Sequence, residues 1–296
     1  MQVLEKRYLD TVLHPSTIQL LRFHFSLFLL PVYLFALSQL PEVKWGSAIL
    51  VFVILHLLIY PSSNGYNSYM DRDTSPIGGL SSPMQPTRQL FYASLVMDAL
   101  ALLLSLYVSV YFAIGILMYI LASRSYSYRG IRLKRYPLAG FLTVFIFQGA
   151  LVFFITYHGC HPQGTLDVPL LPLALSSLLI GALYPLTQVY QHEEDIADGV
   201  RTISYVLGKR GTFLFSAGQF IATTAGFYGL FRQQGQMNQW WLYLVMLLPA
   251  VLFFLLWMVR VWQSPGAADF SNSLRMNGLA TVCTTAFFIT LNFIKH

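Results

Sequence analysis

Two short stretches, residues 67–73 and 191–198, contain the side chains best suited to chemistry. Each combines carboxylates with an amide, and each comes at the end of a long apolar run. Ionisable groups beside or inside a membrane span cost roughly 2.5–3.5 kcal/mol each at the bilayer centre, so they mark a functional site. The chain therefore has two candidate acidic motifs, separated by an interval of four predicted helices.

The spacing within each motif brings oxygen ligands together. Asn67 and Asp71 are four residues apart and share a helix face, whereas Asp73 joins them only if the helix ends near Pro76. Mg²⁺ binds one or two carboxylates and completes its shell with waters and substrate phosphates. The predicted magnesium ligands are Asn67, Asp71, Asp73, Glu194, Asp195 and Asp198. The competing interpretation is that these groups are solvated helix ends, paired with Arg72 and Arg201.

A basic loop lies between the two motifs. It places Arg129, Arg132, Lys134 and Arg135 within seven residues. Arginine matches phosphate oxygens with two parallel hydrogen bonds, so the loop is suited to a polyanion. Contact with anionic lipid would explain the loop equally well when it is taken alone. Beside two acidic motifs, it favours a diphosphate ligand.

The composition identifies the chain as a polytopic membrane protein. It has 296 residues, of which 56% are hydrophobic and 10% charged, with a mean hydropathy of +0.58. Soluble domains have about 25% charged residues. The net charge of +6 lies in short loops, which excludes a nucleic-acid partner and favours contact with membrane lipid.

Nine apolar runs of about 20 residues predict an all-α integral membrane protein with a single domain over residues 1–296. The runs are 18–40, 45–66, 89–109, 111–127, 138–157, 168–189, 212–231, 240–262 and 275–294. The two acidic motifs close the second and sixth runs. This placement predicts an internal duplication.

The basic residues predict the orientation. With a cytoplasmic N-terminus, the outer segments contain only Lys44, Arg232 and Lys295. The inner segments contain Lys6, Arg7, Arg72, Arg88, Arg124, Arg129, Arg132, Lys134, Arg135, Arg201, Lys209, Arg210, Arg260 and Arg275. This asymmetry places both motifs and the basic loop on the cytoplasmic face. Short loops and the lack of a transit segment predict a bacterial inner membrane.

Three motifs in order resemble the UbiA superfamily of intramembrane prenyltransferases. They are Asn67-x3-Asp71, then Tyr126-Ser with Arg132-Leu-Lys134, then Asp195-x3-Gly199-x2-Thr202. The resemblance covers nearly the whole chain. It implies nine helices around a central cavity, a prenyl diphosphate bound through Mg²⁺, and an apolar tunnel for the prenyl tail.

The residues and the resemblance together assign roles. Asp71, Asp195 and Lys134 are the expected catalytic residues. The expected diphosphate ligands are Asn67, Arg72, Arg88, Tyr126, Arg129, Arg132, Lys134 and Arg201. The candidate tyrosines for stabilising positive charge at the reacting carbon are Tyr66, Tyr69, Tyr126, Tyr128, Tyr190 and Tyr205. For each of them, packing or a place in the membrane-interface belt is the competing interpretation and the commoner role of a tyrosine in such a chain. Ser68, Ser75 and Gln191 replace carboxylates that are common in the family.

The predicted activity is Mg²⁺-dependent transfer of a prenyl group from a prenyl diphosphate to a lipophilic or aromatic acceptor. An intramembrane terpene cyclase would ionise the same diphosphate but would need no acceptor. A non-catalytic lipid-binding protein with decayed motifs would bind no metal-diphosphate. A transporter is disfavoured because the charges gather on one face rather than at the midplane.

Overall fold

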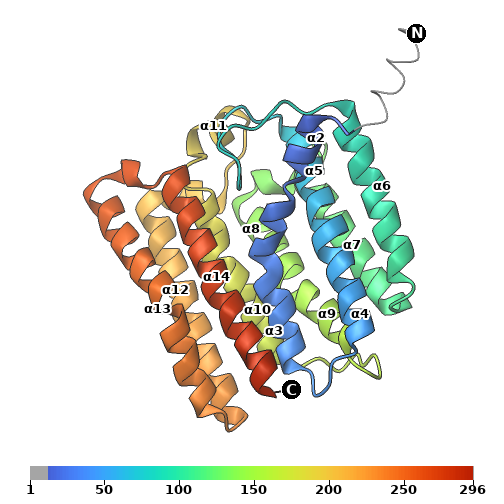
Figure 1. The fold of residues 1–296 in the computed structure, drawn as a ribbon. Coiled ribbons are helices and arrows are strands. Elements are labelled where there is room, and N and C mark those ends of the chain that lie inside the picture. The colour runs from blue at the N-terminus through green and yellow to red at the C-terminus, as the bar shows by residue number, and fades with distance from the viewer. Residues whose placement is uncertain (1–12, 296) are drawn as a thin grey trace.

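The computed structural model describes residues 13–295, and within them the regular structure is entirely helical (Figure 1). Eight of these helices are long and apolar enough to cross a membrane. The protein is therefore an all-α integral membrane protein, as the sequence predicts. Lys6 and Arg7, which contribute to the predicted orientation, lie outside the described residues.

The helices follow the predicted runs closely. Three spans combine three segments each. The first two of them are α2 (Pro15–Leu21), η1 (Phe23–Leu29) and α3 (Leu30–Gln39), then α4 (Trp45–Phe52), η2 (Val53–Ile59) and α5 (Tyr60–Asp71). They are followed by α6 (Arg88–Ser105), α7 (Val110–Ser127), η3 (Leu133–Arg135), α8 (Pro137–Val144), η4 (Phe145–Leu151) and α9 (Val152–Cys160). The remaining elements are α10 (Leu170–Leu183), η5 (Tyr184–Thr187), α11 (His192–Ala197), α12 (Ile203–Gln233), α13 (Met237–Gln263), η6 (Pro265–Ala267) and α14 (Phe270–Lys295).

The count of nine membrane spans is not confirmed. The predicted run 212–231 lies in α12, which is helical but is not among the eight helices apolar enough to qualify in the described part of the chain. A kink interrupts α12 at Gly208, whose φ of 67° is readily adopted only by glycine. The helix is therefore two segments, and its longer part follows the kink.

Two spans contain a π-helical turn. Pro61 is the second residue after η2, and proline lacks the N–H that continues an α-helical ladder. In η4, the Ala150 amide donates to the hydroxyl of Ser177 on α10 at 3.0 Å. Such insertions into the backbone ladder are a usual cause of helix distortion.

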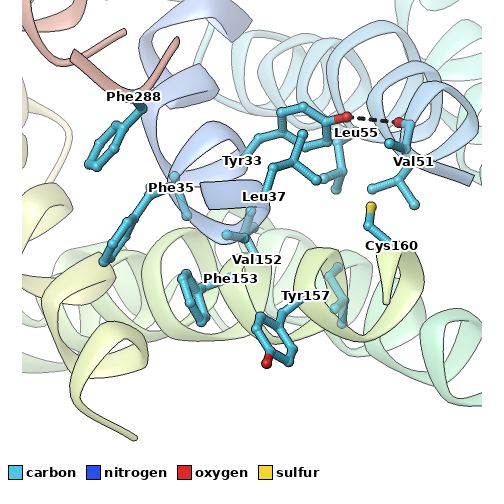
Figure 2. Packing of buried hydrophobic residues seen from close by; sticks show 14 of the residues in the cluster. Tyr33, Phe35, Leu37, Val51, Leu55, Val152, Phe153, Tyr157, Cys160 and Phe288 are labelled. Atoms are coloured by element: carbon cyan, nitrogen blue, oxygen red, sulfur yellow. Dashed lines mark hydrogen bonds between the residues drawn. The ribbon is translucent and has the colours of Figure 1, made fainter. Parts of the chain in front are cut away.

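The aromatic core is centred on α3 (Figure 2). The Phe35 ring is fully buried and stacks on Phe288 of α14, with ring centres 4.9 Å apart. It also packs against Phe153 of α9 and Phe227 of α12. Aromatic pairs of this kind add about 0.5–1.5 kcal/mol beyond the area they bury. This core fixes α3 between helices that are far apart in the sequence.

A buried ion pair joins α5, α6 and α7. Arg124 donates to the Asp98 carboxylate and, at 2.8 Å, to the Ser62 hydroxyl. The guanidinium carbon also lies 4.1 Å from the centre of the Tyr66 ring. Arg124 is therefore not a loop charge, as the predicted orientation assumed. It lies in the last turn of α7 and is largely buried, its partner offsets its desolvation, and it fixes the helix that ends in the first motif.

Candidate active site

A cavity of about 240 Å³ reaches the end of the bundle at which α2, α5 and α11 lie, and Figure 1 shows these three helices at that end. Its lining includes side chains from both acidic motifs and from the basic loop. The predicted site residues that line it are Asn67, Asp71, Asp73, Tyr126, Lys134 and Asp195. The cavity thus brings together residues from three separate parts of the chain.

The last turn of α5 positions the first motif. The Asn67 amide donates to Asp71 Oδ2 at 2.8 Å and to the Ser127 hydroxyl at 3.0 Å. Lys134 donates to the same Asp71 oxygen, and Arg132 lies 3.5 Å from the other. The Asp71 side chain is only 3% exposed. Its carboxylate is therefore held in one orientation by an amide and two cations.

The helix ends directly after Asp71 because Arg72 adopts a left-handed conformation with φ of 57°. The chain then turns back across the end of the bundle, which brings Asp73 to the cavity. Ser75, where the resemblance implies a carboxylate, lies beyond the helix and donates to Glu194. Ser68 is buried and does not line the cavity.

The second motif contributes one carboxylate to the cavity instead of the expected three. Asp195 lines it, as does Gln191. Glu194 instead accepts hydrogen bonds from the backbone amides of Thr74 and Ser75, at 3.3 and 3.4 Å. Glu194 therefore links the two motifs through hydrogen bonds.

Asp198 also lies outside the cavity lining, because it binds the basic loop. Its carboxylate accepts from Arg132 and lies 3.6 Å from Arg129. Burial opposes ionisation of Asp198, but the hydrogen bond and charges of these arginines lower its pKa overall. Asp198 therefore stays ionised and holds the basic loop in place.

The predicted phosphate-binding cations mostly lie elsewhere. Arg72, Arg88, Arg129 and Arg201 are exposed and do not line the cavity, and Arg132 is buried beside it. Lys134 is the predicted cation that lines the wall.

Arg22 is a second cation in the cavity wall that the sequence analysis missed. It ends α2 in a left-handed conformation and is buried, and it donates to the carbonyls of Gly78 at 3.0 Å and Asn64 at 3.3 Å. The available signal was an arginine inside an apolar run.

Tyrosines surround the interior of the cavity. Of the six predicted near the reacting carbon, only Tyr126 lines it. Its hydroxyl lies 2.6 Å from that of Tyr184, which also receives a hydrogen bond from Gln188 at 2.8 Å. Tyr60, Tyr119 and Tyr184 line the cavity and were missed. With 18 tyrosines in the chain, spacing alone did not distinguish them.

The carboxylates that face the cavity fit a divalent cation. Burial is the main cause that raises the pKa of Asp73 to about 6 and that of Asp195 to about 7, and nearby carboxylates add to both shifts. One oxygen of Asp195 is buried without a hydrogen-bond partner among the described residues. Carboxylates that repel one another, with an acceptor oxygen unpaired, form a donor set suited to Mg²⁺.

The donor set is open rather than closed. Between residues 13 and 295, no three or more His, Cys, Asp or Glu side chains are already clustered around one point. Magnesium commonly uses one or two carboxylates and takes its other ligands from substrate phosphates and water. Asp71, Asp73, Asp195 and the Asn67 amide therefore fit an ion that is bound together with a phosphate-bearing ligand.

These pKa values predict pH-dependent metal binding. At pH 6 Asp195 is mostly protonated, and a metal must displace that proton, whereas at pH 8 the carboxylate is already ionised. We expect Mn²⁺, measured by electron paramagnetic resonance, to bind roughly tenfold more tightly at pH 8 than at pH 6. The dependence should weaken in Asp195→Asn. Equal affinity at both pH values would contradict the assignment.

Comparison with known proteins identifies the family. The model of the UbiA prenyltransferase family matches residues 27–279. The chain belongs to the UbiA prenyltransferase family. No protein of curated function shows significant similarity to this UbiA-family chain.

Solved UbiA homologues share the fold. A homologue from Archaeoglobus fulgidus bound to DMAPP and Mg²⁺ is 17% identical, with a TM-score of 0.67 over 94% of this chain and 99% of that one. The same homologue bound to GPP and Mg²⁺ is 18% identical, with a TM-score of 0.65 over the same shares. A homologue from Aeropyrum pernix K1 is 19% identical, with a TM-score of 0.67 over 91% and 98%.

Proposed function

We propose that this UbiA-family protein is a Mg²⁺-dependent intramembrane prenyltransferase. It would transfer a prenyl group from a prenyl diphosphate to a lipophilic or aromatic acceptor. The observation that supports this proposal is the cavity that joins Asn67 and Asp71, Lys134, and Asp195 from three segments of the chain. The A. fulgidus homologue, bound to GPP or DMAPP with Mg²⁺, gives independent support.

In the proposed reaction, the bond between the prenyl carbon and the diphosphate oxygen breaks, the acceptor forms a new bond to that carbon, and the proton that the acceptor loses goes to the departing diphosphate. Bound Mg²⁺ supplies Lewis-acid neutralisation of the departing diphosphate. Asn67 orients the Asp71 carboxylate, and Lys134 adds a fixed positive charge beside it. Preorganised charges of this kind lower the barrier without having to reorganise during the reaction.

The remaining cavity wall stabilises the prenyl group. Phe28, Leu29 and Ile180 offer an apolar surface for the prenyl chain. Tyr126 and Tyr184 present aromatic rings, which stabilise nearby positive charge by about 0.5–2 kcal/mol. A cavity within the helix bundle also excludes bulk water, which would otherwise capture a carbocation.

Lys134→Ala should impair prenyl diphosphate binding more than the chemical step. The variant removes one of two cations that line the cavity, while Arg22 and the carboxylates remain. We expect the KM for geranyl diphosphate to rise about tenfold with a smaller fall in kcat. Arg135→Ala, in the same loop but exposed, is the matched control. A change confined to the acceptor's KM would place Lys134 outside the diphosphate site.

Product analysis tests the proposed reaction class. Purified protein is incubated with Mg²⁺ and geranyl, farnesyl or geranylgeranyl diphosphate, with and without a lipid extract as the acceptor source. Prenyl transfer predicts diphosphate release that depends on the extract, and a prenylated product by mass spectrometry. Release of diphosphate without acceptor, together with a cyclised hydrocarbon, would replace the transferase with a terpene cyclase.

We also propose that the cavity opens on the cytoplasmic face of a bacterial inner membrane. The basic residues Arg129, Arg132, Lys134 and Arg135 lie at the same end of the bundle as the acidic motifs, as expected for a cytoplasmic loop. Accessibility of an engineered cysteine at the exposed position Arg129 to a membrane-impermeant reagent, in sealed inverted vesicles, tests this orientation.

A further inference from the structure

The interior of the cavity has a polar wall that the bound diphosphate and metal would not use. The side chains that form this polar wall are Tyr60 and Ser63 on α5, Tyr119 and Ser123 on α7, and Gln148 on η4. Tyr60 lies eleven residues before Asp71, or about 16 Å along the helix axis, and Tyr119 lies about 12 Å before Ser127. Tyr60 and Tyr119 are therefore well below the acidic motifs, whereas Ser63 and Ser123 lie one helical turn from Asn67 and Ser127.

The polar wall has hydrogen-bonding groups but no charge. The charged side chains that line the cavity are Arg22, Asp71, Asp73, Lys134 and Asp195, and all belong to the end where the motifs meet. The Tyr119 hydroxyl faces the side chains of Gln148 and Ser63. The Ser63 and Ser123 hydroxyls lie 2.6 Å apart. The wall thus offers neutral donors and acceptors only.

One of these groups lacks a partner. The Tyr60 hydroxyl is buried and makes no hydrogen bond within the described part of the chain. Its ring centre lies 5.9 Å from that of Tyr119. A buried hydroxyl without a partner costs about 1–3 kcal/mol, so its position calls for a ligand that supplies one.

Both π-helical turns border this wall. Tyr60 directly follows η2, and Gln148 lies within η4. Turns of this type are rare and occur frequently at functional sites. Two separate spans are therefore distorted at the positions that supply the wall. This observation supports a ligand site independently of the unpaired Tyr60 hydroxyl.

We propose that the polar wall is the acceptor subsite and that the acceptor presents a neutral hydroxyl or carbonyl oxygen to Tyr60, Tyr119 and Gln148. The inference rests on the proposed prenyltransferase function and narrows its substrate class to uncharged phenols, quinols or alcohols. A carboxylate or phosphate head would find no unpaired cation there, because Arg124, whose charge acts on Tyr119, is already paired with Asp98, so its burial would have a large desolvation cost. The prenyl chain uses the apolar surface of Phe28, Leu29 and Ile180 instead.

Binding measurements separate the two ligands. Protein saturated with Mg²⁺ and geranyl thiodiphosphate, a slowly reacting analogue, is titrated with a neutral naphthalenediol, with hydroxybenzoate and with glycerol phosphate. We expect the diol to bind most tightly. Three variants each remove one hydrogen-bonding group from the wall: Tyr60→Phe, Tyr119→Phe and Gln148→Leu. Each should lower the affinity for the diol roughly fivefold, as expected for one neutral hydrogen bond, and leave the affinity for the thiodiphosphate unchanged. Tyr243→Phe, a buried tyrosine on α13 away from the cavity, should change neither.

Three outcomes would overturn the inference. Tighter binding of either anionic probe would show that the acceptor head is charged. If the three variants bind the thiodiphosphate more weakly and the diol as tightly as the unaltered protein, the wall contacts the prenyl chain and not the acceptor. Absence of Mg²⁺-dependent thiodiphosphate binding in the unaltered protein would remove the proposed function together with the inference, whereas the first two outcomes leave that function standing.

Discussion

Asp195→Asn should abolish turnover and make the metal-free protein more stable. Asp195 is the one carboxylate of α11 that lines the cavity, and one of its oxygens is buried without a partner. Even residues that only support a metal ligand cost about 10–100-fold when changed, so we expect a loss greater than 100-fold. Assays of prenyl transfer and thermal unfolding at pH 8 measure both effects.

The stability change follows from the raised pKa of Asp195. Its value of about 7 in the folded protein exceeds the ordinary value of 3.8, so ionisation at pH 8 opposes folding. An amide removes that charge, and the melting temperature should rise. Glu193→Gln, on the same helix but exposed and outside the cavity lining, is the matched control and should change neither quantity. Full turnover in Asp195→Asn would remove Asp195 from the site.

Asp71→Asn should cause a comparable loss of turnover with the opposite change in stability. The Asp71 carboxylate accepts a hydrogen bond from Lys134 and lies 3.5 Å from the Arg132 guanidinium, and its side chain is 3% exposed. Removing the carboxylate takes away the hydrogen-bond partner of Lys134, whose side chain is only 12% exposed, and leaves it only the charges of Asp73 and Asp195. Breaking a buried ion pair typically costs about 3–5 kcal/mol, so the melting temperature should fall.

The control for Asp71→Asn is Asp167→Asn. Asp167 lies in an exposed loop after α9 and outside the cavity, so activity and stability should stay unchanged. Because the Asp71 variant is destabilised, its activity is measured well below its own melting point, on protein shown by circular dichroism to be helical. Turnover within twofold of the unaltered protein under those conditions would contradict a metal-binding or diphosphate-binding role for Asp71.

The architecture was predictable because the length of an apolar run is a local property. Each of the nine runs overlaps a helix, and the first motif ends α5 at Asp71 as the nearby Pro76 suggested. The left-handed Arg72 then turns the chain so that Asp73 reaches the cavity. The predicted internal duplication stays a prediction.

The orientation of side chains in the second motif was not predictable from helical spacing. The α11 helix has six residues and ends before Gly199, whose φ of 71° redirects the chain. The Glu194 carboxylate accepts hydrogen bonds from backbone amides that are 119 and 120 residues away in the sequence. Partners at such separations leave no periodic signal, and the same is true of Asp98 and Arg124. Spacing therefore identified the motif but not which of its carboxylates lines the cavity.

The most direct test of the central claim is thermal unfolding with geranyl diphosphate and longer prenyl diphosphates, with and without Mg²⁺. A ligand at a hundredfold excess over its Kd stabilises the folded state by about 2.7 kcal/mol. We predict a rise in melting temperature that requires both metal and diphosphate and that disappears in Asp195→Asn. A cooperative unfolding transition that no chain length shifts, with or without metal, would contradict a metal-diphosphate site and indicate a lipid-binding protein with decayed motifs.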